Sequence, residues 1–227
     1  LAAEHVNELI SGGLSTHRVI EDFIVESFDR SVVGRTHGPM LAWLASMRPT
    51  ILRRLMDVAP ELLIEDGDPR ALALEDKLDA LRRYVATADG LPADFYLARE
   101  NLPRFADASL EAGVVEQLAT APRGEGFLDL LRLAAAGRYA SAAPIALQLA
   151  SDPFVPSEVK INAMVALVAC GSDADLAACA ACLIRWGPPT FASSVHRFEN
   201  GREDDLRHRL ARHAYPGAIS VTDLIAL

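Results

Sequence analysis

The sequence predicts an all-α fold, an α-solenoid of antiparallel helix pairs joined by short turns. Apolar residues recur at helical spacing in one segment after another, and no stretch alternates apolar and polar residues long enough for a convincing strand. Alanine and leucine are abundant while β-branched runs are rare, and these two residues lose little side-chain freedom in a helix. The 227 residues are enough for one large domain or two small ones.

The N-terminal region predicts two helices followed by a loop. The first helix covers residues 1–10 and stops at Ser11-Gly12-Gly13, because glycine favours helix ends. Its apolar side is expected to consist of Leu1, Val6, Leu9 and Ile10. Ser15 is the expected N-cap of the second helix, and residues 29–38 predict a loop because their periodicity is weak.

Prolines and turn residues delimit the next helices. Pro49 begins a helix because its missing N–H would be unpaired in that position anyway. Pro60 opens one short helical turn, which Asp66-Gly67-Asp68-Pro69 closes. The clearest amphipathic helix then follows, with an apolar stripe of Leu74, Leu78, Leu81 and Val85. Truncation of either Leu78 or Leu81 to alanine is therefore expected to cost about 2 to 5 kcal/mol.

The second half predicts a more regular series of helices. Pro103 is expected to break the segment 95–105, and Gly124–Gly126 reads as a linker that ends a first region at residue 122. The predicted regions are therefore 1–122, 123–185 and a C-terminal helical segment over 186–227. Four helices with short turns are predicted after the linker, over Phe127–Ala136, Ala143–Ala150, Val159–Cys170 and Ala174–Ile184.

A resemblance to HEAT-type repeats is carried by Ala146–Pro153, Val159-Lys160, Ala163, Ala166-Leu167 and Gly171-Ser172-Asp173. In such repeats an Asp-Pro turn ends the first helix, Val-Lys opens the second, and small alanines let the helices approach. The match covers about one and a half repeat units, with a longer turn than usual. It implies that the solenoid consists of HEAT-like antiparallel helix pairs.

A second resemblance is carried by Ala42-Trp43-Leu44-Ala45, Arg48-Pro49, Arg53-Arg54-Leu55, Ala59–Leu63, Asp66–Pro69 and Ala71-Leu72. This run looks like the helical region after the nucleotide-binding core of large bacterial STAND or NACHT-type NTPases. The opening Leu1-Ala2-Ala3-Glu4 is similar to the end of a helix that closes a subdomain in those proteins. The resemblance implies a non-catalytic scaffold or sensor segment of a signalling or antiviral-defence NTPase, which binds proteins or other domains of its own chain.

Charge and cysteine content narrow the classes of partner and compartment. The formal net charge is −9 and the isoelectric point is about 5.1, so the chain lacks the positive field that concentrates nucleic acid or anionic lipid. Three cysteines without a disulfide framework suit a reducing cytoplasm, and no long uncharged apolar run predicts a membrane span. The first residue is leucine, which predicts a chain cut from a larger protein, and the scarcity of lysine beside arginine suggests a bacterial source.

Candidate chemistry is sparse, and we predict no catalytic, cofactor-binding or metal-binding residue and no cofactor. No Gly-x-x-x-x-Gly-Lys-[Ser/Thr] loop precedes Lys77 or Lys160, so an NTPase core is not expected within this chain. The pair Cys179 and Cys182, with Cys170 nearby, has metal or redox spacing, but alanine and leucine flank it, which favours buried packing.

The remaining polar clusters have equally simple interpretations. Glu65, Asp66 and Asp68 lack the ligand order of a calcium loop and suit a turn. Three histidines, at positions 196, 208 and 213, suggest a solvated surface rather than a metal site. Trp43 and Trp186 are expected to anchor helix packing, or a partner if they are exposed. Two alternatives stay open: a HEAT-like enzyme of lyase or base-excision type, which needs a positive cleft, and a purely structural spacer.

Overall fold

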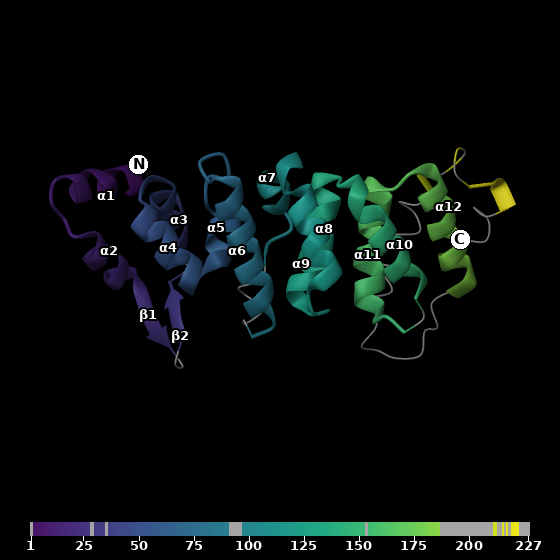
Figure 1. Ribbon diagram of the computed structural model, residues 1–227, viewed down its shortest axis with the longest axis horizontal. Helices are drawn as coiled ribbons and strands as arrows, with labels where there is room; N and C mark the ends of the chain where they lie inside the picture. Colours follow the sequence, from purple (N-terminus) through teal and green to yellow (C-terminus); the bar gives the residue numbers. More distant parts are fainter. Residues whose placement is uncertain are drawn as a thin grey trace. The chain divides into compact units, whose positions relative to one another are not determined.

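The computed structural model describes residues 2–27, 30–34, 36–90, 97–152, 154–186, 211–212, 215, 217 and 219–222. These residues are almost wholly helical, which agrees with the predicted all-α class apart from one β-hairpin (Figure 1). The chain forms two compact units, one from Leu1–Leu110 with Gly124–Gly126 and one from Glu111–Arg123 with Phe127–Leu227. The predicted first region ended at residue 122, whereas the helix over Glu111–Thr120 belongs to the second unit.

The first unit contains most of the helix pairs. Its elements in chain order are α1 (Ala2–Ser11), α2 (Thr16–Phe23), β1 (Ile24–Ser27), β2 (Arg30–Val33), α3 (Gly38–Met47), α4 (Pro49–Val58), α5 (Pro60–Glu65), α6 (Leu74–Thr87), the 3-10 helix η1 (Ala88–Gly90), α7 (Leu102–Phe105) and the 3-10 helix η3 (Ala108–Leu110). Pro49 and Pro60 begin helices as predicted. Pro103 lies in the first turn of α7, so it helps to begin a helix there instead of breaking one.

The strands β1 and β2 correct two expectations. The sequence suggested no strand, and it suggested a loop from residue 29, but the two segments pair antiparallel with Ile24 opposite Val33 and Ser27 opposite Arg30. Four residues in each strand are too few for an alternating pattern to stand out from the neighbouring helix signal. Val33 is buried, so the hairpin contributes to the core of the first unit.

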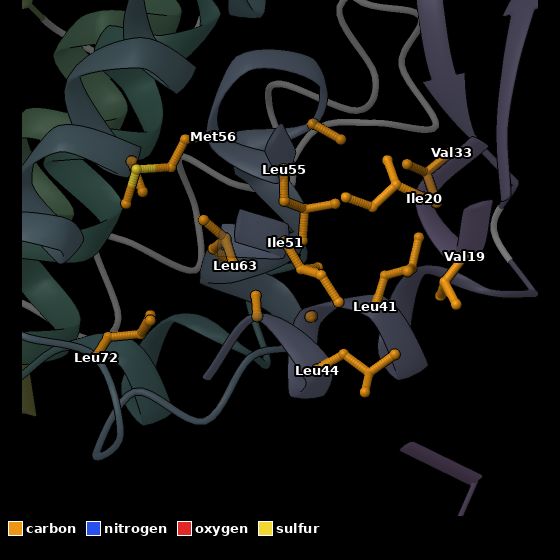
Figure 2. Close-up of a cluster of buried hydrophobic side chains, with 14 of the residues drawn as sticks. Val19, Ile20, Val33, Leu41, Leu44, Ile51, Leu55, Met56, Leu63 and Leu72 are labelled. Atoms are coloured by element: carbon orange, nitrogen blue, oxygen red, sulfur yellow. The ribbon is translucent and has the colours of Figure 1, made fainter. Parts of the chain in front are cut away.

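The core of the first unit gathers apolar side chains from helices that lie far apart in sequence. Figure 2 shows side chains from α2, β2, α3, α4 and α5 meeting in one cluster. The labelled members are Val19, Ile20, Val33, Leu41, Leu44, Ile51, Leu55, Met56, Leu63 and Leu72. Helix α3 packs on α1, α4 and α5, which fixes its inner face within this cluster.

The helix α6 has a different buried face from the predicted stripe. Leu81, Tyr84 and Val85 are buried, but Leu74 is exposed and Leu78 is only half-buried. Lys77 is buried in their place, because its ammonium forms a 2.6 Å ion pair with Asp107. The hydrogen bond from Lys77 holds the pKa of the Asp107 carboxyl below its usual value. The buried face of α6 thus includes a lysine whose partner lies thirty residues away in the sequence.

We expect Leu81→Ala to lower the free energy of unfolding by about 2 to 5 kcal/mol, because Leu81 is fully buried. Leu78→Ala is expected to cost less than about 2 kcal/mol, since a half-buried side chain leaves a smaller cavity. Chemical denaturation of the two variants beside the parent chain measures both values. Equal losses at the two positions would contradict the orientation of α6 described above.

The second unit contains the four helices predicted after the linker. Its elements are α8 (Glu111–Thr120), α9 (Glu125–Gly137), the 3-10 helix η4 (Ala140–Ala142), α10 (Ala143–Ser151), α11 (Ser157–Cys170) and α12 (Asp173–Trp186). Helix α10 packs on both α11 and α12, and alanines such as Ala146, Ala150 and Ala163 are buried among them. Small residues at these positions let the helix axes approach closely, as the sequence suggested.

Two helices end with the same backbone hydrogen bonds. At the end of α1, Leu14 N–H donates to the Leu9 carbonyl and Gly13 N–H to that of Ile10, with Gly13 at a φ of 112°. At the end of α9, Tyr139 N–H donates to Ala134 and Arg138 adopts the left-handed φ of 54°. These are the bonds of the Schellman motif, in which the side chains flanking the turn pack on each other.

Leu9, predicted on the buried side, is instead exposed.

Candidate protein-interaction surface

The outer face of α3 carries large apolar side chains that face solvent. Trp43 is 47% exposed and Met47 is 37% exposed, while Pro39 is also exposed and Met40 is half-buried. At about 100° per residue these four side chains lie on one arc of the helix. We call Pro39, Met40, Trp43 and Met47 the α3 outer stripe.

The stripe is apolar because α3 contains no charged residue at all. Its inner face buries Gly38, Leu41, Ala42, Leu44 and Ala45 against the core, as any amphipathic helix would. Its outer face carries one polar side chain, that of Ser46, whose hydroxyl donates to the Trp43 carbonyl at 2.6 Å. A helix that is apolar on every side is normally buried on every side. Here Trp43 and Met47 keep 47% and 37% of their surface exposed, while Met40 packs partly against the core.

Arginines adjoin one end of the stripe. Arg48 follows Met47 directly, and its guanidinium donates to the Asn7 side-chain oxygen at 2.6 Å and to the Ser11 hydroxyl at 2.5 Å. Both acceptors are neutral, so they position the charge of Arg48 without compensating it. In the next helix Arg53 donates to the Pro49 carbonyl at 3.4 Å, which turns its guanidinium back towards the junction of α3 and α4.

The charge around the stripe differs from that of the whole chain. Residues 30–56 contain five arginines and no aspartate or glutamate, in a chain with a formal net charge of −9. Within the described part of this segment, neither Arg48, Arg53 nor Arg54 forms an ion pair with a carboxylate. These three arginines therefore have no carboxylate within ion-pair distance among the described residues, although the exposed Asp57 follows them in α4. The sequence contains this acid-free segment, but the net charge of the whole chain gives no sign of it.

Other exposed apolar side chains have local explanations. Leu9 and Leu14 flank the Schellman turn after α1, where such a pair normally packs on itself. Phe154 is 93% exposed on the turn between α10 and α11, where its N–H donates to the Asp152 carboxylate at 2.9 Å. A single exposed apolar residue is common on protein surfaces. Among the described residues, α3 alone carries two large exposed apolar side chains one helical turn apart, Trp43 and Met47.

A buried polar network in the second unit joins α9 to α11. Asp129 is 1% exposed and accepts a 2.6 Å hydrogen bond from the Arg132 guanidinium. Arg132 also donates to the Asn162 side-chain oxygen at 3.1 Å, and the Asn162 amide donates to the Glu158 carbonyl. Because the carboxylate and the guanidinium neutralise each other, the network is suited to holding the two helices together.

The predicted turn carboxylates serve separate structural roles. Glu65 accepts a 2.5 Å hydrogen bond from the backbone N–H of Ala98, and Asp68 accepts one from the N–H of Arg70 at 3.0 Å. Burial raises the pKa of the Asp66 carboxyl, and the charge of Arg104 partly offsets this rise. The three carboxyl groups do not converge on a common point, and the described residues contain no group of three His, Cys, Asp or Glu arranged for a metal ion.

Glu61 is a buried acid that sequence analysis missed. It lies in the first turn of α5 and is almost fully buried. The pKa of its carboxyl is raised from 4.5 to about 7, chiefly by burial; the backbone N–H of Glu61 opposes this rise and the charge of Glu65 adds to it. Its place between Pro60 and two leucines gave no sign of burial, because glutamate is common in the first turn of exposed helices.

The cysteines are packing residues, as their apolar flanks suggested. Cys179 and Cys182 are buried in α12, and Cys170 at the end of α11 donates to the Ala166 carbonyl at 2.8 Å. Burial raises the pKa of the Cys170 thiol to about 11 and that of Cys179 to about 12. Since the thiolate is the reactive form, both groups are poor nucleophiles and poor metal ligands near neutral pH.

We therefore expect Cys170 and Cys179 to resist iodoacetamide in the folded chain at pH 8. With pKa values of about 11 and about 12, roughly one thiol in a thousand or fewer is ionised at that pH. Mass spectrometry of the alkylated chain, with and without urea, measures the protection. Rapid modification of either cysteine without urea would show that the thiols are accessible and activated.

Several predicted residues lie outside the described part of the chain. They are His196 and His208 with the charged stretch around them, His213, the side chain of Trp186, and most of the tail over 186–227. Of the two lysines, Lys77 forms the buried pair with Asp107 and Lys160 lies in α11. Trp43 is thus the one tryptophan whose side chain the structure describes. It is 47% exposed, and an exposed tryptophan was expected to anchor a partner.

The chain matches no protein-family model, no curated protein and no solved structure. Among the described helices, none is both long enough and apolar enough to cross a membrane.

Proposed function

We propose that this chain is a non-catalytic helical scaffold or sensor segment, which binds another protein or another domain through the α3 outer stripe. The observation that carries the proposal is an uncharged ten-residue helix whose outer face exposes Trp43 and Met47. Tryptophan and methionine are enriched at the centres of protein interfaces, and contiguous exposed apolar residues mark binding sites more often than isolated ones. The stripe supports binding without any nearby group suited to chemistry.

The wider setting is part of the same proposal. Trp43 and Met47 of the stripe fall inside residues 42–72, the run that looks like the helical region after the core of STAND or NACHT-type NTPases. A segment of that kind passes a signal between a sensor and an ATPase through contacts of helical surfaces. We place the chain in a bacterial signalling or defence NTPase on this resemblance, with α3 as the surface that a neighbouring domain or protein covers.

A photo-crosslinking amino acid in place of Met47 tests the proposal in the organism that carries the gene. We expect one discrete adduct, either with a second protein or with another part of the same polypeptide. The matched control is the same photo-crosslinker in place of Leu74, an equally exposed apolar residue on α6, which should give no such adduct.

The adduct must then depend on the stripe. Trp43→Ser is expected to abolish it and to weaken binding of the purified adduct partner by at least about tenfold, as loss of an aromatic anchor does. Equal adducts at positions 47 and 74, or an adduct that survives Trp43→Ser, would contradict the proposed function.

A further inference from the structure

The shape of the stripe indicates which kind of element covers it. Pro39, Trp43 and Met47 are spaced four residues apart, so their side chains form one continuous ridge along α3. A ridge of this kind fits the groove between the side-chain rows of a second helix. An added strand would instead need unpaired backbone groups at a sheet edge, which an α-helix does not offer. Ten residues span about 15 Å, the length of three helical turns.

The charges at the end of the ridge indicate the composition of that helix. Arg48, Arg53 and Arg54 lack carboxylate partners within the described residues, and Arg48 is held in place by Asn7 and Ser11 of α1. Acidic side chains beside the apolar face of a partner would meet these arginines at the rim of the contact. Opposite charges at a rim steer association and favour the correct partner over others.

Other ligands of arginine fit the surface less well. Nucleic acid and anionic membranes also attract arginine, but both carry dense negative charge and would be repelled by the rest of a chain at −9. Salt screens charges beyond about 8 Å at physiological ionic strength, so a short acidic helix that covers only this surface meets few of the carboxylates, whereas a nucleic acid or a membrane extends over many of them. The local arginines then outweigh the distant carboxylates.

We infer that the occupant of the α3 outer stripe is an amphipathic helix that carries acidic residues beside its apolar face. This inference rests on the proposed function and specifies the chemistry of the partner. It assigns distinct roles to the two parts of the surface. The ridge around Trp43 supplies most of the affinity, and the three arginines select acidic sequences.

A display selection against the whole chain tests the inference. The library consists of helical peptides of about 15 residues, long enough to match α3, with apolar residues on one face. The flanking positions carry Glu, Lys, Gln or Ser at equal frequency. Recovered peptides are expected to be enriched in Glu at those positions and to bind more weakly as salt concentration rises.

Two variants and two controls locate the binding site. Trp43→Ser is expected to weaken a recovered peptide at least about tenfold, and the double variant Arg53→Glu with Arg54→Glu by a similar factor. The matched controls are Leu74→Ser on α6 and Arg70→Glu in the turn before it, both exposed residues of the same unit. Neither control should change the affinity by more than about twofold.

The outcomes separate the two proposals. Peptides that require Trp43 but are not enriched in Glu, or that tolerate the double reversal, would overturn the acidic-helix inference and leave the proposed function standing. No recovered peptide, or peptides indifferent to Trp43→Ser, would overturn both. A further outcome is that the chain sediments with phosphatidylserine vesicles while Trp43→Ser does not. That result would assign the stripe to a membrane surface and would overturn both proposals.

Discussion

Asp129→Ala is expected to lower the free energy of unfolding by about 3 to 5 kcal/mol, the largest effect we predict for a single substitution. Asp129 is almost fully buried in α9 and neutralises Arg132 across 2.6 Å. Removing the carboxylate leaves a largely buried guanidinium with the neutral oxygen of Asn162 at 3.1 Å and the half-exposed Glu158 carboxylate only at 4.0 Å. Urea denaturation of the parent chain and the variant measures the difference.

Two further variants distinguish an ion-pair effect from a general loss of packing. The double change Asp129→Leu with Arg132→Met replaces both charges by apolar groups and is expected to cost less than Asp129→Ala alone. Asp57→Ala breaks the exposed pair between Asp57 and Arg83 and is expected to cost less than about 1 kcal/mol. A loss below about 1 kcal/mol for Asp129→Ala would show that Arg132 reaches water and that the network is not a buried one.

Glu61→Gln is expected to stabilise the chain at pH 8 by about 3 kcal/mol and to have little effect at pH 4. The pKa of Glu61 is about 7 in the folded chain against 4.5 for an ordinary glutamate. Between these two values the unfolded chain releases its proton while the folded chain keeps it. The folded state therefore loses stability as the pH rises from about 4.5 to about 7, and the loss is complete above that range.

Denaturation of the parent chain and of Glu61→Gln at several pH values between 4 and 8 measures how the difference in the free energy of unfolding grows with pH. Glutamine removes the charge with little change in shape, so the variant should lack this part of the pH dependence. Glu75→Gln on the exposed side of α6 is the matched control, with an expected change below about 0.5 kcal/mol at either pH. A gain of the same size at pH 4 and pH 8 would mean that folding does not raise the pKa of Glu61.

The sequence was most informative where a local rule determines a helix end. Pro49 and Pro60 begin helices because of their missing N–H, and Gly13 ends α1 because it reaches a positive φ. It was least informative where a distant residue decides burial. Lys77 is buried through Asp107, thirty residues away, and no spacing of apolar residues within α6 reveals such a partner.

The interaction surface could not be located from hydrophobic periodicity. A polar face normally marks the outside of a helix, but α3 carries no charge and is apolar on both sides. The same ten residues are therefore compatible with complete burial or with an open apolar face. Only the packing of α1, α4 and α5 on one side of α3 shows that Trp43 is left exposed.

The fluorescence of Trp43 tests the central claim most directly. Trp186→Phe leaves Trp43 as the single tryptophan of the chain. We expect the unbound chain to emit like a half-exposed indole and to be readily quenched by acrylamide. A saturating peptide ligand should shift the emission to shorter wavelength and protect the indole from the quencher. Emission typical of a buried indole in the unbound chain, or no change at saturation, would contradict an open α3 outer stripe that a partner covers.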